Sequence, residues 1–302
     1  MIYLKSFKFI TDEEETNFIF PDINDPPPDA LIPWQWMVNM TCYSSFYPFN
    51  IFPQKKLECL CFDEPVTILY GSNGSGKTTA LNIIAEKLHL QRTALYNKSP
   101  FFEPYLDACS FQQVGDIPHG SMMIASDDVF NYMLNVRAVN QEVDFNRSKL
   151  FEEYNKISET PMQTLFKMED FDRNMVAIRR NKLSTSKFIK QNLMNNVREL
   201  SNGESALQYF YEKIQQNALY LLDEPENSLS PERQIMLAKY IEECAWACGC
   251  QFIIATHSPF LVSMKRTRIY NLDECPVTVR KWTELENIRC YWNLFKEHEA
   301  EF

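Results

Sequence analysis

Glycine is scarce in this sequence, with seven residues among 302, whereas glycine usually makes up about 7% of a protein. Long apolar runs are also lacking, and no segment approaches the roughly 20 residues needed to cross a bilayer. The chain does not open with the basic, apolar and small-residue order of a secretory signal. These absences disfavour membrane-spanning and secreted proteins, and we expect a cytoplasmic protein without a membrane contact.

An excess of basic residues is lacking as well, because the net charge is −10. Proteins that coat nucleic acid need a basic surface, so the composition does not support broad nucleic-acid binding. One basic run consists of Arg179, Arg180, Lys182, Lys187 and Lys190. This run could contact nucleic acid, a partner protein or the phosphates of a second subunit, or it could form a solvated helix face.

A zinc-binding pattern is also missing, since there are only four histidines and the nine cysteines are irregularly spaced. The tightest cysteine group is Cys244, Cys248 and Cys250, which lies in apolar surroundings. We interpret this group as buried reduced thiols rather than as a zinc site.

Four of the seven glycines lie in two short segments. Gly71, Gly74 and Gly76 form one segment, and Gly203 marks the other. Residues 71–78 read Gly-Ser-Asn-Gly-Ser-Gly-Lys-Thr, which fits the phosphate-binding loop pattern. A short apolar strand at 65–70 precedes this loop, and a helix at 77–88 with one apolar face follows it. A plain glycine-rich turn is the alternative, but the strand and helix on either side favour the phosphate loop.

The phosphate loop predicts a site for ATP and Mg²⁺. Glycines let successive backbone N–H groups point inward as an anion nest, and the helix N-terminus adds the positive end of its dipole. We expect Lys77 to reach the β- and γ-phosphates and the Thr78 hydroxyl to bind Mg²⁺. The residues predicted to contact the nucleotide are Gly71, Ser72, Asn73, Gly74, Ser75, Gly76, Lys77, Thr78 and Thr79.

Two adjacent acids, Asp223 and Glu224, end a second apolar strand at 218–222. A buried strand would deliver both carboxylates to the edge of the sheet beside the phosphate loop. We expect Asp223 to hold the magnesium shell and Glu224 to polarise the attacking water. Solvated acids at a strand end are the alternative, which the upstream phosphate loop disfavours.

A third segment, at 200–205, opens the helix that carries Leu207. Ser201 and Gly203 would form another anion-binding helix start. The alternative is an ordinary serine N-cap with Glu204 in the first turn.

In their order, these motifs resemble the ABC-type P-loop ATPase superfamily. The matching segments are the phosphate loop, Ser201-Asn202-Gly203-Glu204, Asp223-Glu224-Pro225 and Thr256-His257-Ser258. The resemblance implies an α/β fold with a mostly parallel central sheet, an antiparallel β subdomain and an inserted helical lobe. It also implies that two subunits sandwich two ATP molecules head to tail. Ser201 and Gly203 would contact the γ-phosphate of the partner subunit, His257 would sense the γ-phosphate, and residues 228–230 would form the dimer-crossing loop.

The wording of two segments departs from the transporter pattern, namely the signature and residues 226–231 after Asp-Glu-Pro, which read Glu-Asn-Ser-Leu-Ser-Pro. The signature reads Ser-Asn-Gly-Glu-Ser, and no arginine-rich helix follows it. This wording resembles the soluble branch that includes the RecF and structural-maintenance-of-chromosomes ATPases, and the short insertion suits a small stand-alone relative. The branch implies a soluble switch or motor acting on a nuclease or another effector, in genome maintenance or phage defence. The alternative function is the cytoplasmic ATP-binding subunit of a membrane transporter.

We expect a single domain, with the nucleotide-binding core at 1–125 and 199–272, the helical lobe at 126–198, and a C-terminal strand and helix at 273–302. Two positions stay open. The switch-loop residue is either Gln112 or Gln113 by residue type, or Asp127 or Asp128 by topology. Tyr47, Phe49 or Phe52 could stack on adenine, although core packing is the favoured interpretation of each.

Overall fold

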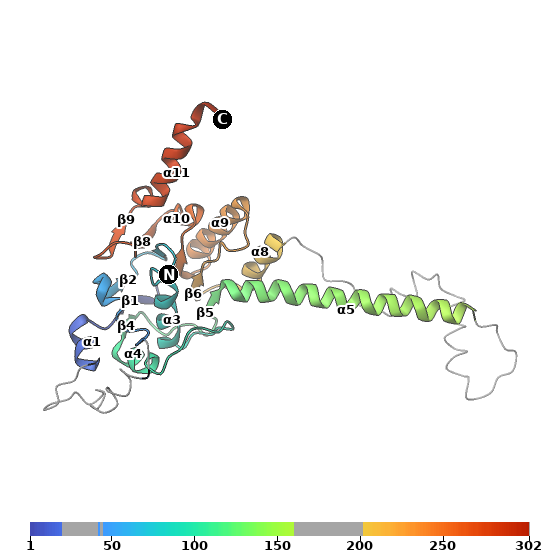
Figure 1. The fold of residues 1–302 in the computed structure, drawn as a ribbon, viewed down its shortest axis with the longest axis horizontal. Helices are drawn as coiled ribbons and strands as arrows, with labels where there is room; N and C mark the ends of the chain where they lie inside the picture. The colour runs from blue at the N-terminus through green and yellow to red at the C-terminus, as the bar shows by residue number, and fades with distance from the viewer. Residues whose placement is uncertain (20–41, 43–44, 160–201, 302) are drawn as a thin grey trace. The chain divides into compact units, whose positions relative to one another are not determined.

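The structure, a computed structural model, describes residues 1–19, 42, 45–159 and 202–301 (Figure 1). The chain divides into two compact units, residues 1–129 with 206–302 and residues 130–205. Ser201, the basic run at 179–190 and the stretch 160–198 of the expected helical lobe lie outside the described residues. The predicted domain boundaries therefore stay predictions.

The larger unit is built on a six-stranded sheet with the order β5-β6-β7-β3-β8-β9. The strands are β3 (Val66–Tyr70), β5 (Met122–Ala125), β6 (Leu219–Asp223), β7 (Gln251–Thr256), β8 (Thr267–Asn271) and β9 (Thr278–Arg280). The first five strands of this order run parallel, and β9 pairs antiparallel with β8. Parallel strands end at one edge of the sheet, so the segments that follow β3, β6 and β7 meet there.

A smaller antiparallel sheet has the order β2-β1-β4 and consists of β1 (Leu4–Lys8), β2 (Cys59–Cys61) and β4 (Ser110–Gln113). Between β1 and β4 the chain also forms the helices α1 (Asp12–Ile19) and α4 (Phe102–Ala108) and the 3-10 turn η1 (Pro53–Lys55). The predicted fold class, a mostly parallel sheet with an antiparallel β subdomain, is confirmed.

Helices pack against the central strands, which explains their apolar sequences. All five residues of β6 are buried, and alternate residues point to opposite faces. Leu219 and Leu221 share a core with α3 (Lys77–Lys87), and α9 (Pro231–Ala247) contacts β7. The apolar stripe of Ile235, Ala238, Ile241 and Ala245 in the sequence predicts the inner face of α9. This prediction is wrong at Ile235, which is 40% exposed. The buried residues of α9 are Leu237, Ala238, Ile241, Cys244 and Ala245.

The remaining helices are α5 (Ser126–Glu159), α8 (Asn202–Lys213), α10 (Pro259–Val262) and α11 (Glu286–Glu297), with 3-10 turns η3 (Trp282–Glu284) and η4 (Glu299–Glu301). No glycine or proline interrupts α5, which continues for 34 residues. Within the described ranges, none of the helices has the length and apolar character needed to cross a bilayer.

Candidate functional site

The loop between β3 and α3 takes a conformation that its glycines make accessible. Gly74 and Gly76 have φ angles of +82° and +92°, which side chains other than glycine rarely adopt. Gly71 is needed for a different reason, because a Cβ atom there would lie 2.5 Å from the Ser75 Oγ atom. The predicted loop therefore forms between a buried strand and the N-terminus of α3.

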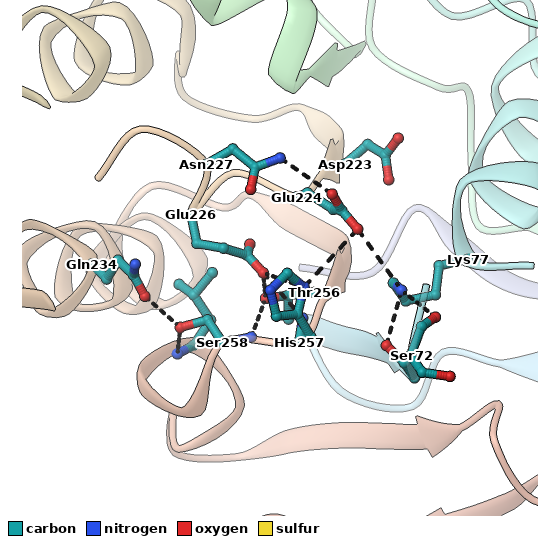
Figure 2. A network of polar contacts seen from close by, with 12 residues as sticks. Ser72, Lys77, Asp223, Glu224, Glu226, Asn227, Gln234, Thr256, His257 and Ser258 are labelled. Atoms are coloured by element: carbon teal, nitrogen blue, oxygen red, sulfur yellow. Dashed lines mark hydrogen bonds and ion pairs between the residues drawn. The ribbon is translucent and has the colours of Figure 1, made fainter. Parts of the chain in front are cut away.

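Lys77 begins α3 and is 4% exposed, so its ammonium group needs partners inside the protein. Its Nζ donates hydrogen bonds of 2.9 Å to the carbonyl oxygens of Gly71 and Ser72 (Figure 2). The Oε1 atom of Glu224 lies 3.8 Å from the same nitrogen. The loop thus folds around the lysine, and the carboxylate after β6 faces it.

Asp223 ends β6 beside the first turn of α3. The hydroxyl of Thr78 donates to Asp223 Oδ1 at 3.0 Å. Burial raises the pKa of Asp223 to about 6, the nearby Glu224 carboxylate adds to the rise, and the Thr78 hydrogen bond opposes it. The structure therefore brings together the hydroxyl and the carboxylate that the sequence assigned to magnesium. Among the described residues, no three histidine, cysteine or acidic side chains form a metal-holding cluster by themselves.

The phosphate loop and Glu224 line one pocket. Its volume is about 310 Å³, near the lower end of small-molecule sites at roughly 300–1,000 Å³. The lining residues are Ile51, Asn73, Gly74, Ser75, Gly76, Lys77, Thr78, Thr79 and Glu224. Seven of these are predicted nucleotide contacts, while Ile51 was not singled out in the sequence.

Glu224 is held in an unusual backbone conformation, with a φ angle of +46°. Such strain in a residue other than glycine persists only where the surroundings impose it, and it is common at functional sites. The Nδ2 group of Asn227 donates to Glu224 Oε2 at 3.2 Å, and the Glu224 N–H donates to the Ala255 carbonyl at 2.9 Å. Asn227 therefore holds the carboxylate of Glu224, and Ala255 holds its backbone.

Glu226, which the sequence analysis missed, organises the end of β7 (Figure 2). It is 5% exposed, and its Oε1 atom accepts hydrogen bonds from the Thr256 hydroxyl at 2.6 Å and the His257 N–H at 3.0 Å. The Nδ1 atom of His257 lies 3.4 Å from Glu226 Oε1 and 4.0 Å from Glu224 Oε1. The third acid in Asp-Glu-Pro-Glu was its only signal in the sequence.

The network continues from His257 to α9. The hydroxyl of Ser258 donates to Gln234 Oε1 at 2.6 Å, and Gln234 Nε2 donates to the Leu229 carbonyl at 3.0 Å. This contact ties the segment after β7 to the segment between β6 and α9, which holds the predicted dimer-crossing residues 228–230.

The structure separates the two proposals for the switch loop. Gln112 and Gln113 lie in β4 of the antiparallel sheet. Asp127 and Asp128 follow β5, whose last residue, Ala125, pairs with Asp223. Asp128 is buried, and its Oδ2 atom accepts the Ala125 N–H at 2.9 Å. Topology therefore places the aspartates, and not the glutamines, at the edge of the sheet that carries the site.

The signature and the aromatic candidates are placed only in part. Gly203 lies in the first turn of α8 and is buried, whereas Ser201 is outside the described residues. Phe49 and Phe52 are buried in the core, as their favoured interpretation predicted. Tyr47 is half-buried, and its hydroxyl donates to Thr79 Oγ1 at 3.4 Å.

Two family models match the chain. The model described as ABC transporter matches residues 55–227, and the model described as AAA ATPase domain matches residues 203–262. Together these ranges contain the phosphate loop, the acids after β6 and the histidine after β7. No curated protein matches the chain at a significant level.

Solved structures show a more distant likeness. One, described as a metal-chelate type ABC transporter in an inward-facing conformation, is 16% identical with a TM-score of 0.38, covering 76% of this chain and 77% of that one. The dimeric ATP-binding cassette MJ0796 bound to ADP and Pi is 15% identical with a TM-score of 0.36, covering 75% and 90%. Because these scores are low, the fold assignment rests on the strand order of the two sheets and not on these likenesses.

Proposed function

The chain belongs to the ABC transporter family of ATPases, and from this premise we propose that it uses ATP hydrolysis at the described pocket to switch a partner protein. The family model spans more than half of the 302 residues. The proposal adds the roles of individual residues, the assembly and the class of partner.

The phosphate loop binds the nucleotide. Backbone N–H groups of the loop and the N-terminus of α3 attract the phosphate charge. Lys77 already bonds the carbonyls of Gly71 and Ser72, which hold its ammonium group beside the pocket. A third proton of the ammonium group remains to bind the β- and γ-phosphates. Tyr47, next to Thr79, is the aromatic residue best placed to contact the base.

The pair Thr78 and Asp223 fits a magnesium ion that the nucleotide also binds. Mg²⁺ prefers hard oxygen ligands and usually combines one or two protein oxygens with phosphates and water. When bound, this ion would neutralise the charge that develops on the phosphates. The Thr78 hydroxyl would bind it directly, and Asp223 would hold its water shell. Their mutual hydrogen bond of 3.0 Å holds the two oxygens side by side.

Glu224 orients the attacking water, and His257 reads the γ-phosphate. Glu224 faces Lys77 at 3.8 Å and lines the pocket, so its carboxylate would face a γ-phosphate that the lysine holds. The Glu226 carboxylate accepts the backbone N–H of His257 and faces the Nδ1 atom of the His257 ring. The observation that carries the proposal is this convergence of Lys77, Asp223 and Glu224 on one loop.

Two substitutions test these roles separately. Lys77→Ala should abolish tight ATP binding, because several phosphate charges lose their buried partner. Glu224→Gln should retain ATP but slow hydrolysis by about 10²-fold or more, since an amide cannot act on the water as a carboxylate does. Titration with a labelled ATP analogue and steady-state phosphate release measure the two effects. Parental affinity in the first variant, or parental turnover in the second, contradicts the assignment.

A second candidate function is the ATP-binding subunit of a membrane transporter, which the description of the matching family model favours. The two candidates differ in their partners. A switch for a nuclease or other effector should purify with a protein that has no membrane spans, whereas a transporter subunit should purify with a membrane-spanning one. Affinity purification of the native complex, with and without detergent, followed by mass spectrometry distinguishes them.

A further inference from the structure

Asp273, a residue outside both ranges that the family models match, contacts the phosphate loop directly. Both carboxylate oxygens accept the backbone N–H of Ser72 at 2.9 Å. Its Oδ1 atom also accepts the Ser72 hydroxyl at 2.8 Å. A single carboxylate from the C-terminal part of the chain therefore binds two donors of one loop residue.

The neighbouring strands hold Asp273 in this place. Strand β8 runs parallel to β3, and Asn271 pairs with Tyr70, the residue just before the loop. The Leu272 N–H donates to the Tyr70 carbonyl at 2.8 Å, and the Asp273 N–H donates to Asn271 Oδ1 at 3.2 Å. Lys55 Nζ binds the Leu272 carbonyl at 2.6 Å. The carboxylate thus comes from an anchored turn.

Ser72 connects this carboxylate to the lysine of the site. Its N–H and hydroxyl face Asp273, while its carbonyl oxygen accepts Lys77 Nζ at 2.9 Å. Fixing Ser72 therefore fixes one of the two carbonyls that aim the ammonium group. Gly71 permits the approach, since a Cβ atom there would lie 3.1 Å from Asp273 Oδ1.

We propose that Asp273 is a positioning residue for ATP binding, which holds the Ser72 peptide so that Lys77 stays aimed at the phosphates. The inference rests on the proposed function and deepens it. Without this anchor, the Ser72 carbonyl can turn away, and Lys77 can move toward Glu224, 3.8 Å away. In the nucleotide-free protein the ammonium group would then pair with the Glu224 carboxylate, and ATP would have to break this pair in order to bind.

Charge alone predicts the opposite effect, which makes the proposal testable. A carboxylate near a site for a highly charged anion repels that anion, so its removal should tighten ATP binding. Positioning requires that its removal weakens ATP binding. The sign of the change in affinity therefore separates the two explanations.

The experiment compares Asp273→Ala, Asp273→Asn and a matched control, Glu274→Gln. Glu274 belongs to the same turn, but its carboxylate contacts Asn271, Thr278 and Arg280 and not the loop. We expect the Kd for ATP to rise about tenfold in Asp273→Ala, equivalent to about 1.4 kcal/mol. Asp273→Asn keeps one acceptor and should raise it about threefold. The control removes the same charge and should not weaken binding.

Steady-state kinetics separate positioning from a general loss of structure. The KM for ATP should rise with the Kd, while kcat at saturating ATP should change by less than about twofold, because Glu224 keeps its contacts. Misfolding would lower kcat without changing KM. Thermal unfolding of the nucleotide-free variants identifies any loss of stability. If Asp273→Ala is destabilised, Asp273→Asn decides the question.

The outcomes distinguish this inference from the proposed function. If the parent binds ATP and Lys77→Ala does not, the site is correct. Equal or tighter binding by both Asp273 variants then overturns the positioning role, as does equal weakening in Glu274→Gln. If the parent itself does not bind ATP, the proposed function fails first.

Discussion

A buried carboxylate on α1 shows how one residue can make the stability of this protein depend on pH. Glu15 is 2% exposed, and its Oε1 atom accepts the Asn50 N–H at 2.6 Å. Burial raises its pKa from the usual value near 4.5 to about 7; the Asn50 hydrogen bond opposes this rise, and the Asp12 charge adds to it. Asn50 directly precedes Ile51, a lining residue of the pocket.

The raised pKa predicts that stability falls as the pH rises. Between the unfolded and folded pKa values, from about 4.5 to about 7, the folded protein binds the proton that the unfolded chain releases. Ionisation therefore favours unfolding, and the shift corresponds to about 3 kcal/mol. Glu15→Gln should remove this loss while keeping an acceptor for Asn50. Urea unfolding of parent and variant at about pH 5 and about pH 8 measures the difference.

The control for this prediction is Glu13→Gln, which removes the same charge from an exposed position of α1. It should leave the pH dependence of the parent unchanged. If the free energy of unfolding of Glu15→Gln depends on pH as steeply as that of the parent, Glu15 is not the group that titrates.

At this scale, residues within a contiguous motif could be predicted and those with remote partners could not. Lys77 and Thr78 belong to the phosphate loop pattern, so their places followed from the sequence. Asp273 contacts Ser72 across 201 positions of the chain, and Glu226 reaches Thr256 across 30. Nothing in the local sequence of either acid indicates its partner, because the sheet topology alone brings them together.

The elements of the chain followed from apolar pattern where burial is complete. The strands at 251–256 and 66–70 are buried at every residue, and their largely apolar sequences indicate buried strands. Short edge strands carry less signal, as in β9, which spans only Thr278–Arg280 and has two exposed residues among its three. Ile235 was misplaced because a helical stripe of apolar residues does not show which of its edges a neighbour covers.

Gln251 joins the two sheets at the element scale. Its side chain is fully buried at the start of β7, and its Oε1 atom accepts the backbone N–H groups of Tyr3 at 2.7 Å and Leu4 at 2.9 Å. Its Nε2 group donates to the Leu4 carbonyl at 2.8 Å. One amide therefore forms hydrogen bonds with three buried backbone groups, the N–H of Tyr3 and the N–H and carbonyl of Leu4.

Replacing this amide should be costly. Gln251→Met keeps the length of the side chain but leaves three buried polar groups without partners, each worth about 1–3 kcal/mol. We expect a loss of about 3 kcal/mol or more in the free energy of unfolding. The control is Gln208→Met on the exposed face of α8, with an expected change below about 0.5 kcal/mol. Denaturant unfolding measures both, and equal values would refute the joining role.

At the scale of the whole molecule, every residue that lines the pocket belongs to one copy of the chain. Its lining consists of Ile51, the phosphate loop with Thr79, and Glu224, all from the larger unit. The predicted contacts from a second subunit, Ser201 and Gly203, belong to the signature before and within α8. By the family resemblance, the γ-phosphate would therefore be read by two copies of the chain, one through its phosphate loop and the other through its signature.

This arrangement predicts that ATP joins two subunits and that ADP does not, because ADP lacks the group that the second subunit reads. A ligand that binds the dimer better than the monomer shifts the equilibrium by mass action. Glu224→Gln with ATP and Mg²⁺ should accumulate as a dimer in sedimentation or light scattering. Adding Ser201→Arg should return it to monomers that still bind ATP, whereas Asn293→Arg, on exposed α11, should not. If Glu224→Gln stays monomeric at every ATP concentration, the homodimeric sandwich is contradicted. If the dimer is equally strong with ADP, its interface does not depend on the γ-phosphate.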